Sequence, residues 1–127
     1  MIAADTDVLI DYLAGRDPAA SVLAAAITDG RLATTAVNRF ELLAGARTAR
    51  QQRTMLTLLN AMIVWPLDSA AADRAAAVRR QLERTGTPIG MADSLVAGIV
   101  LTRDGALYTR NGRHFGRVDG LQRVRQP

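Results

Sequence analysis

The chain has 127 residues, a length that fits one compact domain. Hydrophobic residues make up 49% of it and charged residues 22%, which is typical of globular and not of disordered proteins. No apolar run approaches the roughly 20 residues needed to cross a bilayer, and the first residues lack the basic segment of a signal peptide. With no cysteine, disulfides and thiolate metal sites are excluded. We therefore expect a cytoplasmic protein that forms a single domain over residues 1–127, with no membrane partner.

The basic residues of the chain, apart from its one histidine, are all arginines. The chain has 16 arginines and no lysine against 12 acids, for a net charge of +4. The segment 105–127 holds only one acid beside five arginines, which are Arg110, Arg113, Arg117, Arg123 and Arg125. Guanidinium groups bind phosphate in a bidentate manner, so an anionic partner such as nucleic acid is one interpretation. The other is that an Ala-rich, Lys-free chain reflects genome composition and solubility, and charge alone leaves both open.

Short apolar runs alternate with segments of helical periodicity along the chain. Strands are expected over residues 1–4, 32–35, 62–65 and 106–109, with a short edge strand over 123–125. Helices are expected over residues 8–13, 19–28, 37–46, 51–60, 70–84 and 91–102. This alternation predicts a mainly parallel sheet covered on both faces. Ligands bind such sheets beyond the carboxyl ends of the strands, so a site is expected there.

Asp5 directly follows the first expected strand. It therefore lies at the edge of the sheet where a ligand site is expected. An acid just before a helix also serves as an N-cap, because its carboxylate accepts hydrogen bonds from the first free backbone N–H groups. Both roles stay open for Asp5.

Glu41 interrupts an apolar stripe in the expected helix 37–46. The apolar residues at the spacing of one buried helix face are Val37, Phe40 and Ala44. Glu41 shares that spacing, so its carboxylate needs a partner or must lie at the rim of the buried face. The alternative is a salt bridge to Arg39 or Arg47.

Asp93 lies in the segment 89–101, which is apolar on every side and should form a central helix. An isolated buried carboxylate would cost several kcal/mol or take up a proton, and a bound cation removes that cost. The alternative is that Asp93 caps a helix that begins at Ser94.

Three acids in apolar surroundings, from three different elements, indicate a carboxylate cluster around a hard cation. Oxygen-only ligands favour Mg²⁺ or Mn²⁺ over zinc. Such a site permits a metal-activated water to attack a phosphodiester, with the ion stabilising the developing charge. The arginines would then offset the repulsion between these acids and a phosphate.

The sequence resembles the PIN-domain family, and within it the VapC-type toxins of prokaryotic toxin–antitoxin pairs. The matching motifs are residues 4–13, 38–45, 90–97 and 108–115, followed by Gly120-Leu121. The resemblance implies an α/β/α sandwich with a sheet of about four to five strands, and a Mg²⁺- or Mn²⁺-dependent ribonuclease. It also implies a homodimer that forms a higher assembly with a small cognate antitoxin, whose tail occupies the active-site groove.

The resemblance also assigns roles by position. The residues carried over as metal ligands and catalytic acids are Asp5, Glu41 and Asp93. By the same resemblance, Thr6 would orient the Asp5 region, and Thr109 and Asn111 would line the pocket. Apart from the resemblance, Asp7 is also expected to support the site. Arg110 and Arg113, next to the end of the last central strand, would position the RNA backbone.

The last motif departs from the family pattern. Many relatives carry a fourth acid where this chain has His114, and Asn111 is an amide instead of an acid. We therefore expect one tightly held ion and not two. Three roles stay open for His114: it would protonate a leaving group, contact RNA or be structural. Asp119 is a candidate for the missing fourth acid, but its Asp-Gly pair is more simply interpreted as a turn. Asp11 is expected to face solvent, and Trp65 to serve a dimer contact or the core.

A second hypothesis is a non-catalytic module that binds RNA or a protein, with a structural cation in the acidic pocket. It predicts RNA binding that survives chelation and no cleavage with any metal. A phospho-acceptor receiver domain also uses an acidic pocket, but it needs a lysine that this chain lacks.

Overall fold

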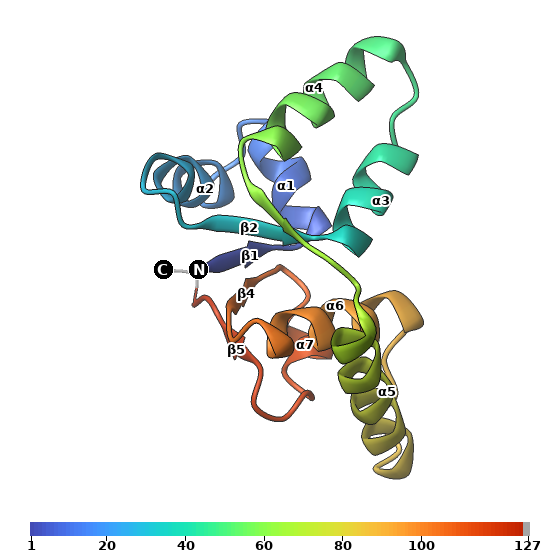
Figure 1. Cartoon of the computed structure of the whole chain (residues 1–127). Coiled ribbons are helices and arrows are strands. Elements are labelled where there is room, and N and C mark those ends of the chain that lie inside the picture. The colour runs from blue at the N-terminus through green and yellow to red at the C-terminus, as the bar shows by residue number, and fades with distance from the viewer. Residues whose placement is uncertain (126–127) are drawn as a thin grey trace.

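The computed structural model describes residues 1–125, which form one five-stranded sheet with helices on both sides (Figure 1). The strands are β1 (Ile2–Ala4), β2 (Leu32–Thr35), β3 (Ile63–Trp65), β4 (Ala106–Tyr108) and β5 (Gln122–Arg123). Their order is β3-β2-β1-β4-β5, and each neighbouring pair runs parallel. The carboxyl ends of the strands therefore lie along a single edge of the sheet.

The helices follow the predicted pattern closely. They are α1 (Thr6–Leu13), α2 (Ala19–Thr28), α3 (Ala36–Ala44), α4 (Ala49–Asn60), α5 (Ser69–Arg84), α6 (Met91–Thr102) and α7 (Gly112–Phe115). The short α7 was not expected, because its sequence begins with Asn-Gly and this pair is typical of a turn. Within residues 1–125, no helix has the length and apolar character needed to span a bilayer.

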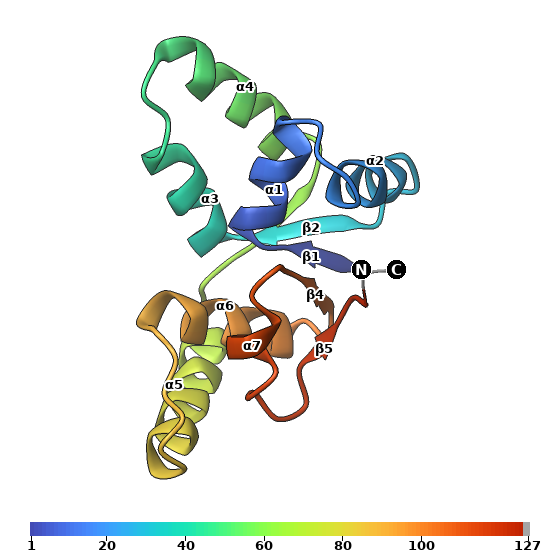
Figure 2. The ribbon, with the colours of Figure 1, turned by 180° about the vertical axis from the view of Figure 1, so that it is seen from behind.

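The sheet separates two layers of helices, as the opposite views in Figures 1 and 2 show: α1 to α4 cover one face and α5 to α7 the other. Alternation along the strands builds the two cores. In β1, Ala3 packs with residues of α5, α6 and α7, whereas Ala4 packs with residues of α1 to α4. In β4, Leu107 and Tyr108 divide between the cores in the same way. The α/β/α sandwich is confirmed.

Helix α6 is central, as predicted, and it is held by a close approach to α5. A Cβ atom added to Gly98 would lie 2.6 Å from the Cβ of Ala75 and 2.7 Å from the carbonyl oxygen of Ala71. Only a residue without a side chain lets the two backbones come this near. This packing holds α6 in place against α5, and it therefore also positions Asp93 in the first turn of α6.

The predicted apolar stripe of α3 is wrong. Phe40 is 70% exposed, and the buried residues of this helix are Asn38 and Leu42. Helix α3 turns its polar Asn38 toward Asp5 at the end of the sheet, while the exposed Phe40 lines a hollow beside Glu41. Periodicity shows that a helix has an apolar face but not whether the chain itself covers that face.

Trp65, for which two roles were open, packs in the core with an exposure of 7%. A Cβ on Gly105 would lie 2.5 Å from the indole ring, so the turn before β4 fits directly against it. Trp65 is therefore a core residue that packs against the turn before β4.

Candidate active site

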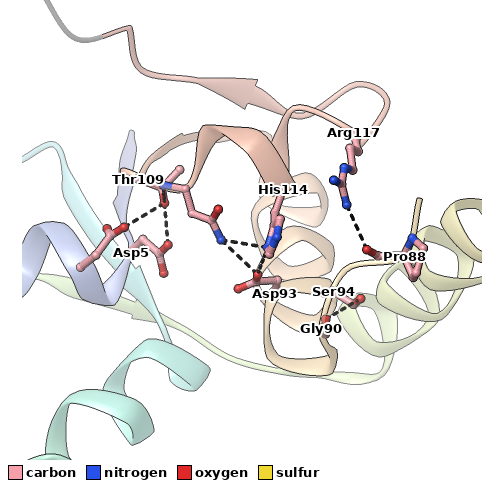
Figure 3. Close-up of polar contacts among 10 residues, drawn as sticks. Asp5, Pro88, Gly90, Asp93, Ser94, Thr109, His114 and Arg117 are labelled. Carbon is pink, nitrogen blue, oxygen red and sulfur yellow. Dashed lines mark hydrogen bonds and ion pairs between the residues drawn. The ribbon is translucent and has the colours of Figure 1, made fainter. Parts of the chain in front are cut away.

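Asp5 occupies the carboxyl end of the central strand β1 and is only 8% exposed. Its Oδ1 accepts hydrogen bonds from the backbone N–H of Thr6 at 2.9 Å and from Nδ2 of Asn38 at 2.8 Å. Its Oδ2 accepts one from Oγ1 of Thr109 at 2.7 Å (Figure 3). Asp5 is thus the N-cap of α1 and also the centre of a polar network. The two roles are compatible.

Asn38 is fully buried and was not among the predicted site residues. Thr35, the N-cap of α3, donates its hydroxyl to Oδ1 of Asn38 at 2.7 Å and accepts the Asn38 backbone N–H. This pairing fixes the amide so that its NH₂ group faces the acids. The signal in the sequence was the spacing Thr35-x-x-Asn38, in which a capping threonine precedes a polar residue on the buried side of the helix.

Glu41 lies one turn along α3 from Asn38 and is exposed. Its Oε1 accepts a hydrogen bond from Oγ1 of Thr6 at 2.8 Å, and Nδ2 of Asn38 lies 3.5 Å away. Within residues 1–125 Glu41 forms no salt bridge, so pairing with Arg39 or Arg47 is not observed. Thr6 therefore connects Glu41 to the N-cap of α1.

Asp93 projects from the first turn of α6, whose N-cap is Gly90, so the proposal that Asp93 caps the helix is wrong. Its Oδ2 accepts a hydrogen bond from Nδ2 of Asn111 at 3.3 Å and lies 3.2 Å from Nδ1 of His114 (Figure 3). Nδ2 of Asn111 and Nδ1 of His114 are themselves 3.1 Å apart. His114 thus belongs to the polar group around Asp93.

A continuous path of hydrogen bonds links Asp93 to Asp5. The backbone N–H of Asn111 donates to Oγ1 of Thr109 at 2.9 Å, and the same hydroxyl donates to Asp5. Asn111 therefore contacts Asp93 with its side chain and Thr109 with its backbone. Neutral side chains lie between the three predicted acids. Asp5 directly follows β1, Glu41 lies in α3 and Asp93 lies in α6, and all three are at one edge of the sheet.

Asp7 supports the same segment from α1. Its Oδ2 accepts the backbone N–H of Arg110 at 3.0 Å, while its Oδ1 is buried and has no hydrogen-bond partner in residues 1–125. Burial, and then the negative charge of Asp5, raise the pKa of Asp7 above its ordinary value of 3.8, although the hydrogen bond from Arg110 lowers it. Asp7 thus holds the backbone beyond Thr109.

The prediction that Asp11 faces solvent is wrong, because Asp11 is only 8% exposed. Its carboxylate lies 3.1 Å from Nε of Arg110 and 3.5 Å from Nη1 of Arg16. Two guanidinium groups compensate for the burial of this acid. Arg110 is consequently paired within the chain, whereas the exposed Arg113 forms no salt bridge with the residues described here.

Other charged residues of the last segment stabilise its backbone. Nη1 of Arg117 donates to the carbonyl oxygen of Pro88, and Nη1 of Arg123 donates to that of Gly112. Asp119 accepts a hydrogen bond from Gln81 of α5 at 2.8 Å. Asp119 therefore contacts α5 and none of the site residues, in agreement with the simpler interpretation of its Asp-Gly pair as a turn.

The donor atoms fit a hard cation, although they are not gathered as tightly as a closed metal site. Among residues 1–125, no three Asp, Glu, His or Cys side chains converge closely enough to hold an ion. The oxygens Oε2 of Glu41 and Oδ1 of Asp93 accept no hydrogen bond from these residues, so their lone pairs are available. Carboxylate oxygens on a site open to solvent are the ligands that Mg²⁺ and Mn²⁺ prefer.

Comparisons with known proteins identify the family of the chain. The PIN-domain family profile matches residues 2–121. Ribonuclease VapC10 of Mycobacterium tuberculosis is 37% identical over 122 residues, which cover 96% of this chain and 91% of that protein. The tRNA(fMet)-specific endonuclease VapC of Shigella flexneri is 30% identical over 100 residues, 76% of each chain.

A solved structure shows the same fold at lower sequence identity. It is that of VapBC2 from Rickettsia felis bound to a DNA fragment from their promoter. One of its chains superposes with a TM-score of 0.86 and 20% identity over the whole of both chains. By its profile match and its similarity to these relatives, the chain belongs to the PIN-domain family and, within it, to the VapC proteins.

Proposed function

We propose that the protein is a metal-dependent endoribonuclease that acts as the toxin of a toxin–antitoxin pair. The observation that carries the proposal is the hydrogen-bonded path from Asp5 through Thr109 and Asn111 to Asp93, with Glu41 joined to Asp5 through Thr6. The names of the two VapC relatives, a ribonuclease and a tRNA(fMet)-specific endonuclease, support RNA as the substrate. The whole chain would act as one catalytic domain in the cytoplasm, where such RNA occurs.

The residues that would hold a Mg²⁺ or Mn²⁺ ion are Asp5 and Asp93, with Glu41 as a direct or water-mediated ligand. When bound, the ion would lower the pKa of a coordinated water and stabilise negative charge on the phosphate. Asp5 is positioned by three donors, so its carboxylate has little freedom to rotate. Glu41 is held at one oxygen only, which leaves the other free to accept a proton from water.

The remaining residues would orient the acids and the RNA. Thr109 and Asn111 set the distance between the Asp5 and Asp93 ends of the site. His114 stands beside Asp93 where many relatives carry a fourth acid, which supports one tightly held ion. Arg113, exposed in the first turn of α7, would contact the RNA backbone together with Arg110.

The partners would be a cognate antitoxin and a second copy of the chain. The Rickettsia felis protein of the same fold was solved as part of a VapBC assembly, which supports an antitoxin partner. The exposed apolar side chains Phe40, Leu67 and Met91 line one hollow beside Glu41. An apolar surface of this kind supports the homodimer that the family resemblance implies.

The alternative is a binding module with no catalytic activity. The observation that favours it is that no three acidic side chains in residues 1–125 converge at ion-binding distance. Such a module would bind RNA without cleaving it, and its binding would survive chelation.

The test is cleavage of defined RNAs by the purified, antitoxin-free protein, with Mg²⁺, with Mn²⁺ and with a chelator. The substrates would be tRNA(fMet), a ribosomal RNA loop and a messenger RNA. We expect cleavage at a discrete position that stops on chelation and resumes when the metal is returned. RNA binding without cleavage under each metal would favour the binding module instead.

A further inference from the structure

Asp11 forms ion pairs beside the candidate site, and the proposed catalytic steps do not use it. Asp11, on α1, is buried, and its two carboxylate oxygens face different arginines. Oδ2 lies 3.1 Å from Nε of Arg110, and Oδ1 lies 3.5 Å from Nη1 of Arg16. The side chain of Arg110 is still 56% exposed, and neither of its Nη groups donates a hydrogen bond to residues 1–125. Arg110 is therefore held at its Nε and open at its outer end.

The backbone of Arg110 is held as well as its side chain. Asp7, one helical turn before Asp11, accepts the backbone N–H of Arg110 at 3.0 Å. Thr109, the preceding residue, donates its hydroxyl to Asp5. Three carboxylates at positions 5, 7 and 11 thus fix two consecutive residues after β4. The guanidinium group of Arg110 cannot move far from the site without losing its contact with Asp11.

We propose that Asp11 is a positioning residue for RNA binding, because it holds the guanidinium of Arg110 so that the Nη groups are presented to a backbone phosphate. The inference rests on the proposed function and names how one part of that site is organised. A free arginine loses rotamer entropy when it binds phosphate. An arginine already held at its Nε loses less of it, so the pairing with Asp11 raises RNA affinity.

The proposal and the net charge of the surface predict opposite changes in RNA affinity when Asp11 is replaced. Removing the negative charge of Asp11 makes the surface more positive, which by itself strengthens RNA binding. If Asp11 acts by positioning Arg110, the same change weakens RNA binding. An increase in affinity and a decrease in affinity are therefore the outcomes that separate the two explanations.

The experiment measures RNA affinity in protein that carries Asp93→Asn, so that cleavage does not consume the probe. A fluorescently labelled tRNA(fMet) transcript is titrated in Mg²⁺ at several salt concentrations. The variants, each added to Asp93→Asn, are Asp11→Asn, Arg110→Gln, the two combined, and Arg16→Gln. Arg16→Gln is the matched control, because it removes one positive charge and the other ion pair of Asp11 but leaves Arg110 in place. Thermal unfolding of each variant shows whether it is folded at the assay temperature.

Asp11→Asn and Arg110→Gln should each weaken binding about fivefold. The double variant should bind RNA no more weakly than Arg110→Gln alone, because both substitutions remove the same contact. Arg110→Gln should also reduce the slope of log affinity against log salt by about 0.7 to 0.9. In the active protein, Asp11→Asn should raise KM and leave kcat unchanged, a separation that general loss of folded protein would not produce.

Equal or tighter RNA binding by folded Asp11→Asn protein would overturn the positioning role while leaving the nuclease assignment intact. Equal losses for Arg16→Gln and Arg110→Gln would overturn it too, because only overall charge would then matter. If the parent protein bound neither tRNA(fMet) nor the ribosomal and messenger RNAs of the cleavage test, the proposed function itself would be wrong, and the inference with it.

Discussion

The hydroxyl of Thr109 lies 2.7 Å from Oδ2 of Asp5, and this contact joins the ends of two neighbouring parallel strands. The two residues are far apart in the sequence, yet the register of β1 with β4 pairs Ala4 with Tyr108, which places the following residues opposite each other. The contact is buried, so each partner depends on the other for a hydrogen bond. The position of the candidate site at this edge of the sheet therefore follows from strand pairing.

Replacing Thr109 with valine tests this contact directly. The variant keeps the shape of the side chain but leaves Oδ2 of Asp5 and the backbone N–H of Asn111 without their partner. We expect the free energy of unfolding to fall by about 1–3 kcal/mol, measured by urea denaturation. Thr57→Val is the control, since its exposed hydroxyl bonds only to its own helix and the change should cost less than about 0.5 kcal/mol. Equal stability of the two variants would show that the buried contact contributes little.

Replacing Gly98 with alanine tests the packing that positions Asp93. The new Cβ would lie 2.6 Å from the backbone nitrogen of Ala75, so α5 and α6 must separate. We expect a loss of about 1–3 kcal/mol in the free energy of unfolding, despite the better helix propensity of alanine. Gly45→Ala is the control, because the backbone there has a φ of −80° and an added Cβ meets only ordinary van der Waals contacts at 3.5 Å. A stability unchanged by Gly98→Ala would mean that the helices have room to separate at no cost.

The raised pKa of Asp7 predicts a pH-dependent effect on stability. Because burial and Asp5 disfavour its charged form in the folded protein, Asp7 binds its proton more tightly there than in the unfolded chain, where the pKa is close to 3.8. Ionised Asp7 therefore destabilises the fold as pH rises from about 3.8 through the raised pKa, and the cost is absent below that range. As pH rises through this range, the free energy of unfolding of Asp7→Asn should increase relative to that of the parent protein. Above the range, the difference between the two proteins should stay constant.

Urea denaturation of both proteins at a series of pH values measures that difference. Titration of the other acids largely cancels between them, so the change with pH reports Asp7. A difference that stayed constant from acid to neutral pH would show that Asp7 titrates alike in the folded and unfolded states.

The sequence predicted most of the fold because its signals were local. The apolar runs and helical periodicity located each strand and six helices, and Gly and Pro marked most of the ends. The four-residue helix α7 was missed because its Asn-Gly start is typical of turns. Such a short helix depends on tertiary contacts, here the bond from Arg123 to Gly112, which no local pattern reveals.

The three acids of the candidate site could be proposed from the sequence because carboxylates in apolar segments are costly, whereas their hydrogen-bond partners could not. Asn38 carries no charge that marks it in the sequence, and its role depends on Thr35, three positions earlier, fixing its amide. Asp11 was wrongly placed in solvent because one of the two arginines that compensate for its burial, Arg110, lies 99 positions along the chain. Phe40 was wrongly placed in the core because an apolar face looks the same whether the chain or a partner covers it.

The central claim, that Asp5, Glu41 and Asp93 form a metal-dependent ribonuclease site, is tested most directly by cleavage with Asp93→Asn protein. Asp119→Asn is the control, because that acid is exposed and contacts Gln81 away from the site. Both variants and the parent protein are purified in the same way, checked for folding, and assayed on one cleavable RNA with Mg²⁺. We predict that Asp93→Asn lowers the rate by at least about 100-fold and that Asp119→Asn leaves it unchanged. Full activity in folded Asp93→Asn protein would contradict the assignment of the site.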